Sequence, residues 1–216
     1  MARLLHIALI CLAPHAHACE TPVCIVDPEI LRLTRIITFQ ETQSSNGPGR
    51  LVKDLLVMDG ASFGERFAGQ MLDREGDHDR VTGRALPPLT LLPGAPGQGL
   101  SVVYMSGENV LNGYGPAGFP KRKGQGEGAI AVLFDDDQVE LSFQIRGGEA
   151  GHARAMFLRR DGSVISELDL FGAGETAIGF ARSGNEIDIA GVVITNTDVE
   201  GLAIDNLRFG RAPDVS

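Results

Sequence analysis

Apolar and polar residues alternate along several short stretches of the chain. Residues 139–145 read VELSFQI and residues 186–189 read EIDI, so an apolar side chain stands at every second position. This period of two is typical of a β-strand with one buried face. We expect further strands near residues 35–40, 51–58, 100–105, 129–134, 175–181 and 202–209.

Turn signals separate these stretches. Asp161 and Gly162 lie between two strand-like runs, which predicts a β-hairpin. About ten short strands with turns between them predict an all-β fold, a single antiparallel jelly-roll β-sandwich over residues 35–210 followed by a tail at 211–216. The segments 73–99 and 109–128 are rich in Gly and Pro and are expected to be loops, and the three aspartates at 135–137 are expected to form a turn.

The chain begins with MARLLHIALICLAPHAHA. One arginine, Arg3, precedes an apolar run at residues 4–13, and Ala-His-Ala at 16–18 is a small-x-small cleavage site. We therefore expect residues 1–18 to be a secretory signal peptide and the mature protein to be periplasmic or extracellular. A lipoprotein signal at Cys19 fits less well, because Ala16 stands where leucine is usual. No later apolar stretch is long enough to predict a membrane span.

Two cysteines, Cys19 and Cys24, follow the predicted leader in an N-terminal segment at residues 19–34. In an oxidising compartment this spacing predicts a small disulfide ring. The formal net charge of the full chain is −9, which argues against nucleic acid as a partner. The one basic cluster, residues 121–123, is interpreted as a solvated loop.

Residues 60–64 read GASFG, which matches the G-x-S-x-G pattern of a nucleophile elbow. An elbow needs a parallel sheet with helices and a histidine base, and an order of Ser62, Asp136 and His152 can be written down. The region from 129 to 209 instead reads as strand after strand. We therefore favour turn or bulge glycines at Gly60 and Gly64 and assign no catalytic residue.

Four segments together resemble a known group of proteins: GASFGERFAGQ at 60–70, ENVLNGYGPAGFP at 108–120, GEGAIAVLFDDDQVELSFQIRGG at 126–148 and GLAIDNLRFG at 201–210. They resemble exported bacterial β-jelly-roll proteins of the PEP-CTERM or VPLPA-type group, which are similar to carbohydrate-binding modules and lectin-like domains. The resemblance implies a jelly-roll fold. After Phe209 the sequence departs from the group, since GRAPDVS stands where a sorting tail is expected.

Strand parity indicates two carboxylates on core faces. Asp205 shares a parity with Leu207 and Phe209, and Glu41 shares one with Ile37 and Phe39. A charged carboxylate on a core face costs several kcal/mol unless it is compensated. Similarity to jelly-roll binding modules implies a structural calcium ion held by Glu41 and Asp205. The alternative is that each acid lies at a solvated rim or caps backbone N–H groups.

These observations favour a secreted or periplasmic non-catalytic binding module for polysaccharide or another glycan. Tyr114, in the sequence NGYGP, is the aromatic residue that we expect to face a ligand, unless it packs its loop onto the sandwich. A structural or adhesive surface protein that binds other proteins is the alternative. A polysaccharide-active enzyme would need a pair of carboxylates facing a cleft, and the spacing identifies no such pair.

Overall fold

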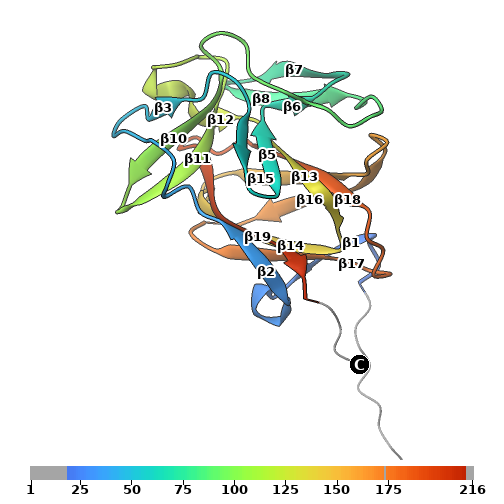
Figure 1. Ribbon diagram of the computed structural model, residues 1–216. Coiled ribbons are helices and arrows are strands. Elements are labelled where there is room, and N and C mark those ends of the chain that lie inside the picture. The colour runs from blue at the N-terminus through green and yellow to red at the C-terminus, as the bar shows by residue number, and fades with distance from the viewer. Residues whose placement is uncertain (1–18, 173, 213–216) are drawn as a thin grey trace, which may run out of the picture.

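The computed structural model describes residues 19–172 and 174–212. The predicted signal peptide lies outside the described residues. Two sheets pack face to face, and every pairing between named strands is antiparallel, which confirms the predicted β-sandwich (Figure 1). The described residues form nineteen strands rather than about ten, because several are only two to four residues long.

The larger sheet has nine strands. Their order along the main path is β1 (Val23–Val26), β17 (Ala177–Arg182), β14 (Glu140–Gly147), β19 (Leu202–Arg211), β11 (Glu108–Tyr114), β10 (Gly99–Met105) and β3 (Arg50–Leu51). Two further strands complete it, with β2 (Leu33–Ile37) beside β19 and β12 (Gln125–Gly128) beside β11.

The smaller sheet has six strands. Their order is β16 (Val164–Phe171), β15 (His152–Leu158), β18 (Ile189–Asn196), β13 (Ile130–Gln138), β5 (Ala61–Gly64) and β4 (Leu56–Met58). β15 and β16 form the hairpin predicted from Asp161 and Gly162, and Gly162 has a φ of 80° in its turn. Two short 3-10 helices, η1 (Pro28–Ile30) and η2 (Arg122–Gly124), lie outside the sheets.

The main core fills the space between the two sheets. Alternation along β14 places Leu141, Phe143 and Ile145 in this core, as the sequence predicts. The ring of Phe180 lies 5.1 Å from that of Phe143 and 5.1 Å from that of Phe157, so the large sheet and the small sheet meet through aromatic contacts.

A third layer covers the outer face of the smaller sheet. It consists of β6 (Arg66–Phe67) paired with β9 (Leu91–Leu92) and of the hairpin formed by β7 (Gln70–Glu75) and β8 (His78–Gly83). Phe67 and Leu91 pack there against Ala131 and Val193, which point away from the main core. The expectation of a loop at 73–99 is therefore corrected, because part of it pairs as an antiparallel hairpin in which Asp73 stands opposite Arg80. Its polar, solvent-facing residues hid these strands from a reading based on apolar alternation.

Two other expected irregular segments are also strands. The segment 109–128 holds most of β11 and all of β12, and the three aspartates at 135–137 lie within β13 at a register shift. At the N-terminus, Cys19 and Cys24 form the predicted disulfide beside β1. In the part of the chain that the structure describes, no helix is long and apolar enough to cross a membrane.

Candidate functional site

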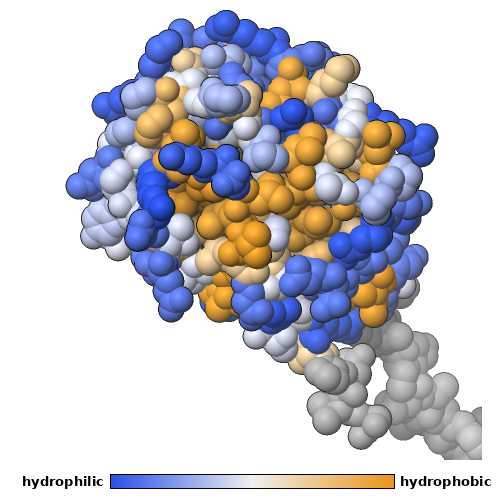
Figure 2. All heavy atoms as spheres, turned by 45° about the horizontal axis from the view of Figure 1, so that its top comes forward, coloured by the Kyte–Doolittle hydropathy of each residue, from blue (hydrophilic) through white to orange (hydrophobic). Residues whose placement is uncertain are grey.

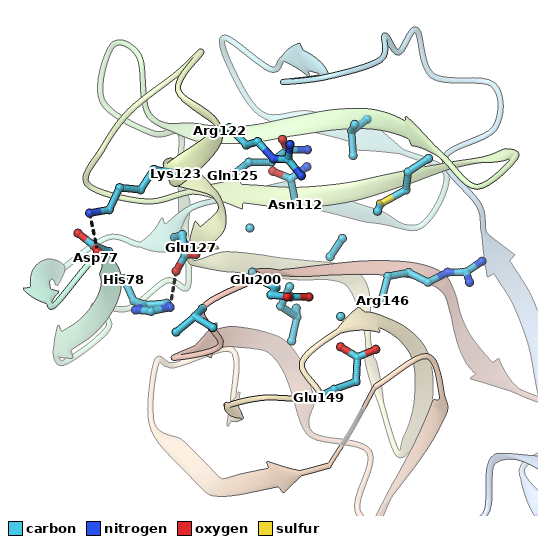
Figure 3. A pocket seen from close by; sticks show the side chains of 18 of the residues that line it. Asp77, His78, Asn112, Arg122, Lys123, Gln125, Glu127, Arg146, Glu149 and Glu200 are labelled. Atoms are coloured by element: carbon cyan, nitrogen blue, oxygen red, sulfur yellow. Dashed lines mark ion pairs between the residues drawn. The ribbon is translucent and has the colours of Figure 1, made fainter.

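A groove of about 760 Å³ lies on the outer face of the larger sheet (Figure 3). Its floor is formed where β10, β11, β14 and β19 run side by side, and Val103 and Ala203 contribute small apolar side chains to it. The β7–β8 hairpin closes one end with Asp77 and His78. Segments far apart in the sequence therefore supply the walls.

Glycines let the backbone segments at the groove approach closely. A Cβ atom on Gly126 would lie 2.7 Å from the backbone nitrogen of Leu202, and one on Gly113 would lie 2.3 Å from the carbonyl oxygen of Gly128. Both distances are too short for any side chain to fit without displacing backbone. The close packing of β12 against β11 and β19 leaves the floor open beside Asn112.

Ion pairs hold several charged side chains of the rim. Lys123 lies 2.9 Å from Asp77, whose pKa is lowered chiefly by the hydrogen bond from Lys123. Arg146 contacts Glu108 and lies 2.7 Å from Glu175. These pairs fix the rim but leave other polar groups of the groove without a partner.

His78 and Glu127 form a buried pair at the hairpin end of the groove. The Nε2 atom of His78 contacts the Oε2 atom of Glu127 and lies 2.9 Å from the carbonyl oxygen of Asp198. Burial raises the pKa of Glu127 to about 7, although the neighbouring His78 acts in the opposite direction. The pair therefore carries a proton-binding group near neutral pH.

Several side chains of the groove lining have free hydrogen-bonding groups. Among the described residues, Arg122, Glu149 and Glu200 have no partner for their charged groups, and the amide nitrogen of Asn112 has no acceptor although its side chain is only 2% exposed. In Figure 3, Arg122 and Asn112 lie on one side of the groove, and Glu149 and Glu200 lie on the other. A polar ligand with both donors and acceptors matches this arrangement.

Sequence reasoning missed this set. The side chains of the basic cluster at 121–123 are exposed, as expected, but η2 also places Arg122 and Lys123 on the groove wall. Asn112 is two residues from Tyr114, within the segment quoted for the resemblance, but its burial could not be read from the sequence. The groove also draws on strands that the sequence shows as unrelated stretches.

A second buried acidic pair, Glu65 and Asp79, lies outside the groove. Burial and the charge of Asp79 raise the pKa of Glu65 to about 7, and burial raises that of Asp79 to about 6. Arg66 lies 2.8 Å from Glu65, but the Oε1 atom of Glu65 has no hydrogen-bond partner among the described residues. Glu65 stands between β5 and β6, where Phe63 packs in the main core and Phe67 in the covering layer, so sequence alternation does not assign its side chain to one face.

The parity argument for Asp205 is corrected by a β-bulge. Asn206 has a φ of 48°, and β19 has one more residue than β14 between the pairs Ile204–Ile145 and Phe209–Leu141. Ile204 and Leu207 consequently both face the main core, and Asp205 lies on the outer face with Ala203. Its side chain is buried there nonetheless.

The structure does not bring Glu41 and Asp205 together in a buried site. Glu41 is exposed in a turn after β2, whereas both carboxylate oxygens of Asp205 accept N–H groups of Asn206. Burial raises the pKa of Asp205. N–H donors at both oxygens do not fit a bound cation, and the described residues contain no group of three or more metal-ligating side chains. Calcium binding by these residues stays a prediction.

Tyr114 packs inside the protein rather than facing a ligand. Its side chain is fully buried, its hydroxyl donates to the carbonyl oxygen of Pro48 at 3.1 Å, and its ring centroid lies 5.2 Å from that of Phe119. The ring thus offers no free face to a sugar. This geometry is the alternative role considered for Tyr114, in which the ring anchors its segment to the sandwich.

Replacing Tyr114 by phenylalanine should therefore affect stability and not ligand binding. Loss of the hydroxyl leaves the Pro48 carbonyl without this donor, and we expect the free energy of unfolding to fall by about 1 kcal/mol. Urea unfolding measures this change. A loss of glycan affinity at unchanged stability would restore Tyr114 as a ligand contact.

The GASFG segment is not a nucleophile elbow. Ser62 lies within β5, paired with Val57 of β4 on one side and with Leu133 of β13 on the other. Gly60 has a φ of 88° in the turn between β4 and β5, which confirms the interpretation as a turn glycine. A mid-sheet serine in an antiparallel sheet lacks the strand-to-helix turn that exposes a nucleophile.

Comparisons with known proteins give little. No family model matches the chain, and no curated protein matches it. One similar solved structure contains the N-terminal CBM22-1 and GH10 modules of an endo-1,4-beta-D-xylanase of Clostridium thermocellum, complexed with xylohexaose. The likeness has a TM-score of 0.33 and 12% sequence identity, and it covers 55% of this chain and 25% of that chain.

Proposed function

We propose that this protein is a non-catalytic binding module whose groove holds a segment of a polysaccharide. The observation that carries the proposal is Asn112, a residue only 2% exposed that lines the groove and whose amide nitrogen has no acceptor among the described residues. Side chains that are almost wholly buried usually have their polar groups hydrogen-bonded, so an amide nitrogen that stays accessible from the groove is a donor available to a ligand.

The size and chemistry of the groove agree with such a ligand. A volume of about 760 Å³ is within the range of ligand pockets in proteins. Arg122 and Gln125 can donate to ring and hydroxyl oxygens, while Glu149 and Glu200 can accept from hydroxyl groups. The groove binds through hydrogen bonds rather than aromatic stacking, so each contact contributes only about 0.5–1.5 kcal/mol.

The site of action that we propose is the periplasm or the extracellular space. The predicted signal peptide and the Cys19–Cys24 disulfide both support it, because disulfides persist in oxidising compartments. Determination of the N-terminal residue of the protein isolated from its natural host tests the leader. A mature chain starting at or near Cys19 is the expected result.

A glycan array followed by calorimetry tests the proposed binding. We expect Asn112→Ala and Arg122→Ala each to weaken binding of the best glycan about fivefold to tenfold, since each removes one or two hydrogen bonds. Arg208→Ala is the matched control, because Arg208 is exposed outside the groove. The array is run with and without calcium, which also tests the predicted ion.

The absence of binding to any glycan of the array would contradict the proposal. Binding that neither Asn112→Ala nor Arg122→Ala weakens would also contradict it. Calcium that raises neither the glycan affinity nor the melting temperature would remove calcium from the proposal without affecting the groove.

Protein–protein adhesion is the second candidate, and one edge of the smaller sheet favours it. The outermost strand β16 exposes 68% of Phe171 and 46% of Val164, and an edge strand also presents unpaired backbone groups. Independently of the β16 edge, Figure 2 shows a face on which hydrophobic residues gather in the middle and hydrophilic residues surround them. Concentration-dependent self-association in sedimentation, removed by Phe171→Ser, would favour this role.

A further inference from the structure

We infer that the ligand of the groove carries amino groups, and that its class is an amino-sugar polymer in which part of the N-acetyl groups has been removed. The inference rests on the proposed function and names the ligand of that same groove. The chemical class of the ligand is inferred from the charged side chains of the groove lining that have no partner among the described residues.

The lining of the groove is acidic. Five carboxylates face three fixed cations, since Asp77, Glu127, Glu149, Glu175 and Glu200 line it together with Arg122, Lys123 and Arg146. The cations Lys123 and Arg146 are held by Asp77 and Glu175, and Arg146 also contacts Glu108 outside the lining. Glu127 contacts His78. Among the described residues, the unpaired charges that remain lie on three exposed side chains, the carboxylates of Glu149 and Glu200 and the guanidinium of Arg122.

The unpaired charges are separated across the groove. Glu149 follows β14 and Glu200 precedes β19, and Figure 3 shows both on the side opposite Arg122 and Asn112. An ammonium group fits the acidic side, because it donates three hydrogen bonds and carries the opposite charge. An acetamido carbonyl fits the other side, where the free Asn112 amide and the Arg122 guanidinium are donors. A polymer that carries both ammonium and acetamido groups can therefore bond to the carboxylates on one side of the groove and to the donors on the other.

The same charges select against other glycans. Polymers of uronic acids or sulfated sugars would bring anions to Glu149 and Glu200 in a protein whose formal net charge is −9. Neutral polymers would leave the two carboxylates without a cation. The free amide of Asn112 distinguishes this arrangement from a solvated acidic patch, because its side chain is 2% exposed and still reaches the groove.

Calorimetry with matched oligomers tests the inference. The probes are β-1,4-linked N-acetylglucosamine oligomers of one length, either fully acetylated or partly deacetylated, at a pH at which the free amines are protonated. We expect the deacetylated probe to bind about tenfold more tightly and to lose this advantage in high salt. Chemical re-acetylation of the same sample should restore the weaker binding.

Paired variants locate the effect. Glu149→Gln combined with Glu200→Gln should abolish the preference for the deacetylated probe while the acetylated probe still binds. Glu20→Gln combined with Glu29→Gln changes the net charge equally at exposed positions outside the groove and should keep the preference. Circular dichroism confirms that both pairs fold.

Each contrary result has a separate meaning. Binding of neutral glycans with no gain from free amines would overturn the inference and leave the proposed function standing. Absence of binding to any glycan would overturn both. A preference that survives in the Glu149 and Glu200 variant, or that disappears equally in the control, would overturn the assignment to these carboxylates.

Discussion

Lowering the pH from about 8 to about 5.5 is expected to raise the free energy of unfolding of this protein by about 3 kcal/mol. Three buried carboxyl groups are the cause. Burial and the charge of Asp79 raise the pKa of Glu65 from 4.5 to about 7, and burial raises the pKa of Asp79 from 3.8 to about 6. Burial also raises the pKa of Glu127 to about 7.

The sign follows from proton binding in the two states. Between pH 4.5 and about 7 the folded protein keeps a proton on Glu65 that the unfolded chain has released. Stability is therefore lost as the pH rises through this window. The raised pKa of Glu65 corresponds to about 3 kcal/mol in full, of which about 2 kcal/mol falls between about pH 5.5 and about 7. The neighbouring Asp79 adds less than its own shift because the two groups interact.

Carboxyl groups whose pKa is lowered in the folded protein limit its stability at low pH. The pKa of Asp188 is lowered, because hydrogen bonds from Arg182 and Arg159 together exceed the opposing effect of burial. Its contribution to stability is present above its ordinary pKa of 3.8 and is lost at lower pH. Maximum stability is therefore expected in mildly acidic solution.

Urea unfolding across the pH range measures this profile, and Glu65→Gln isolates its main cause. The glutamine does not titrate, so the dependence between about pH 5.5 and about 8 should become much flatter. Glu41→Gln is the matched control, since Glu41 is exposed in a turn, and it should keep the slope of the natural protein. A protein that becomes less stable on acidification from neutral pH would contradict the assignment.

The sandwich could be predicted because its signals are local. The alternation at 139–145 reflects a strand with one face in the main core, and the Asp-Gly pair at Asp161 sets the turn of the β15–β16 hairpin. The N-terminal disulfide could be predicted for a similar reason, since Cys19 and Cys24 are close in the sequence. Each of these features depends on neighbours within a few residues.

The face of Asp205 could not be predicted because one residue changed the register. Parity assigns a face only while a strand continues without a bulge, and the extra residue at Asn206 exchanges the two faces of β19. An asparagine can adopt a positive φ, but nothing in IDNLRF marks the bulge. The calcium argument was built on that parity and lost its main support there.

The groove could not be predicted because its parts meet only in three dimensions. His78 and Glu127 are in contact although they belong to segments that were both expected to be loops. Tyr114 seemed the natural sugar contact by residue type, whereas the structure buries its ring and leaves the amide of Asn112 free. Residue type indicates which side chains can bind a ligand, and only packing decides which of them face the groove.

Replacing Phe67 by alanine is expected to lower the free energy of unfolding by about 3–5 kcal/mol and also to weaken ligand binding. Phe67 is fully buried in the layer that covers the smaller sheet. Its ring fills the space that Gly191 leaves open, because a Cβ atom there would lie 2.6 Å from the ring. Phe67 shares the anchoring of residues 66–92 with the buried Leu89 and Leu91. Loss of its ring, the largest of these side chains, should loosen this segment and the hairpin that closes the groove.

Phe180→Ala separates the local effect from the global one. Phe180 is equally buried, but it packs in the main core against Phe143 and Phe157 and touches no part of the covering layer. Both variants should lose a similar free energy of unfolding. Only Phe67→Ala should also loosen the hairpin that carries Asp77 and His78. Below the melting temperature, this variant should show faster hydrogen exchange in residues 70–83 and a lower affinity for glycan. Phe67→Leu serves the same comparison if alanine prevents folding. Equal exchange and equal affinity in the two variants would show that the hairpin is held without the Phe67 ring, and that the groove does not depend on the third layer.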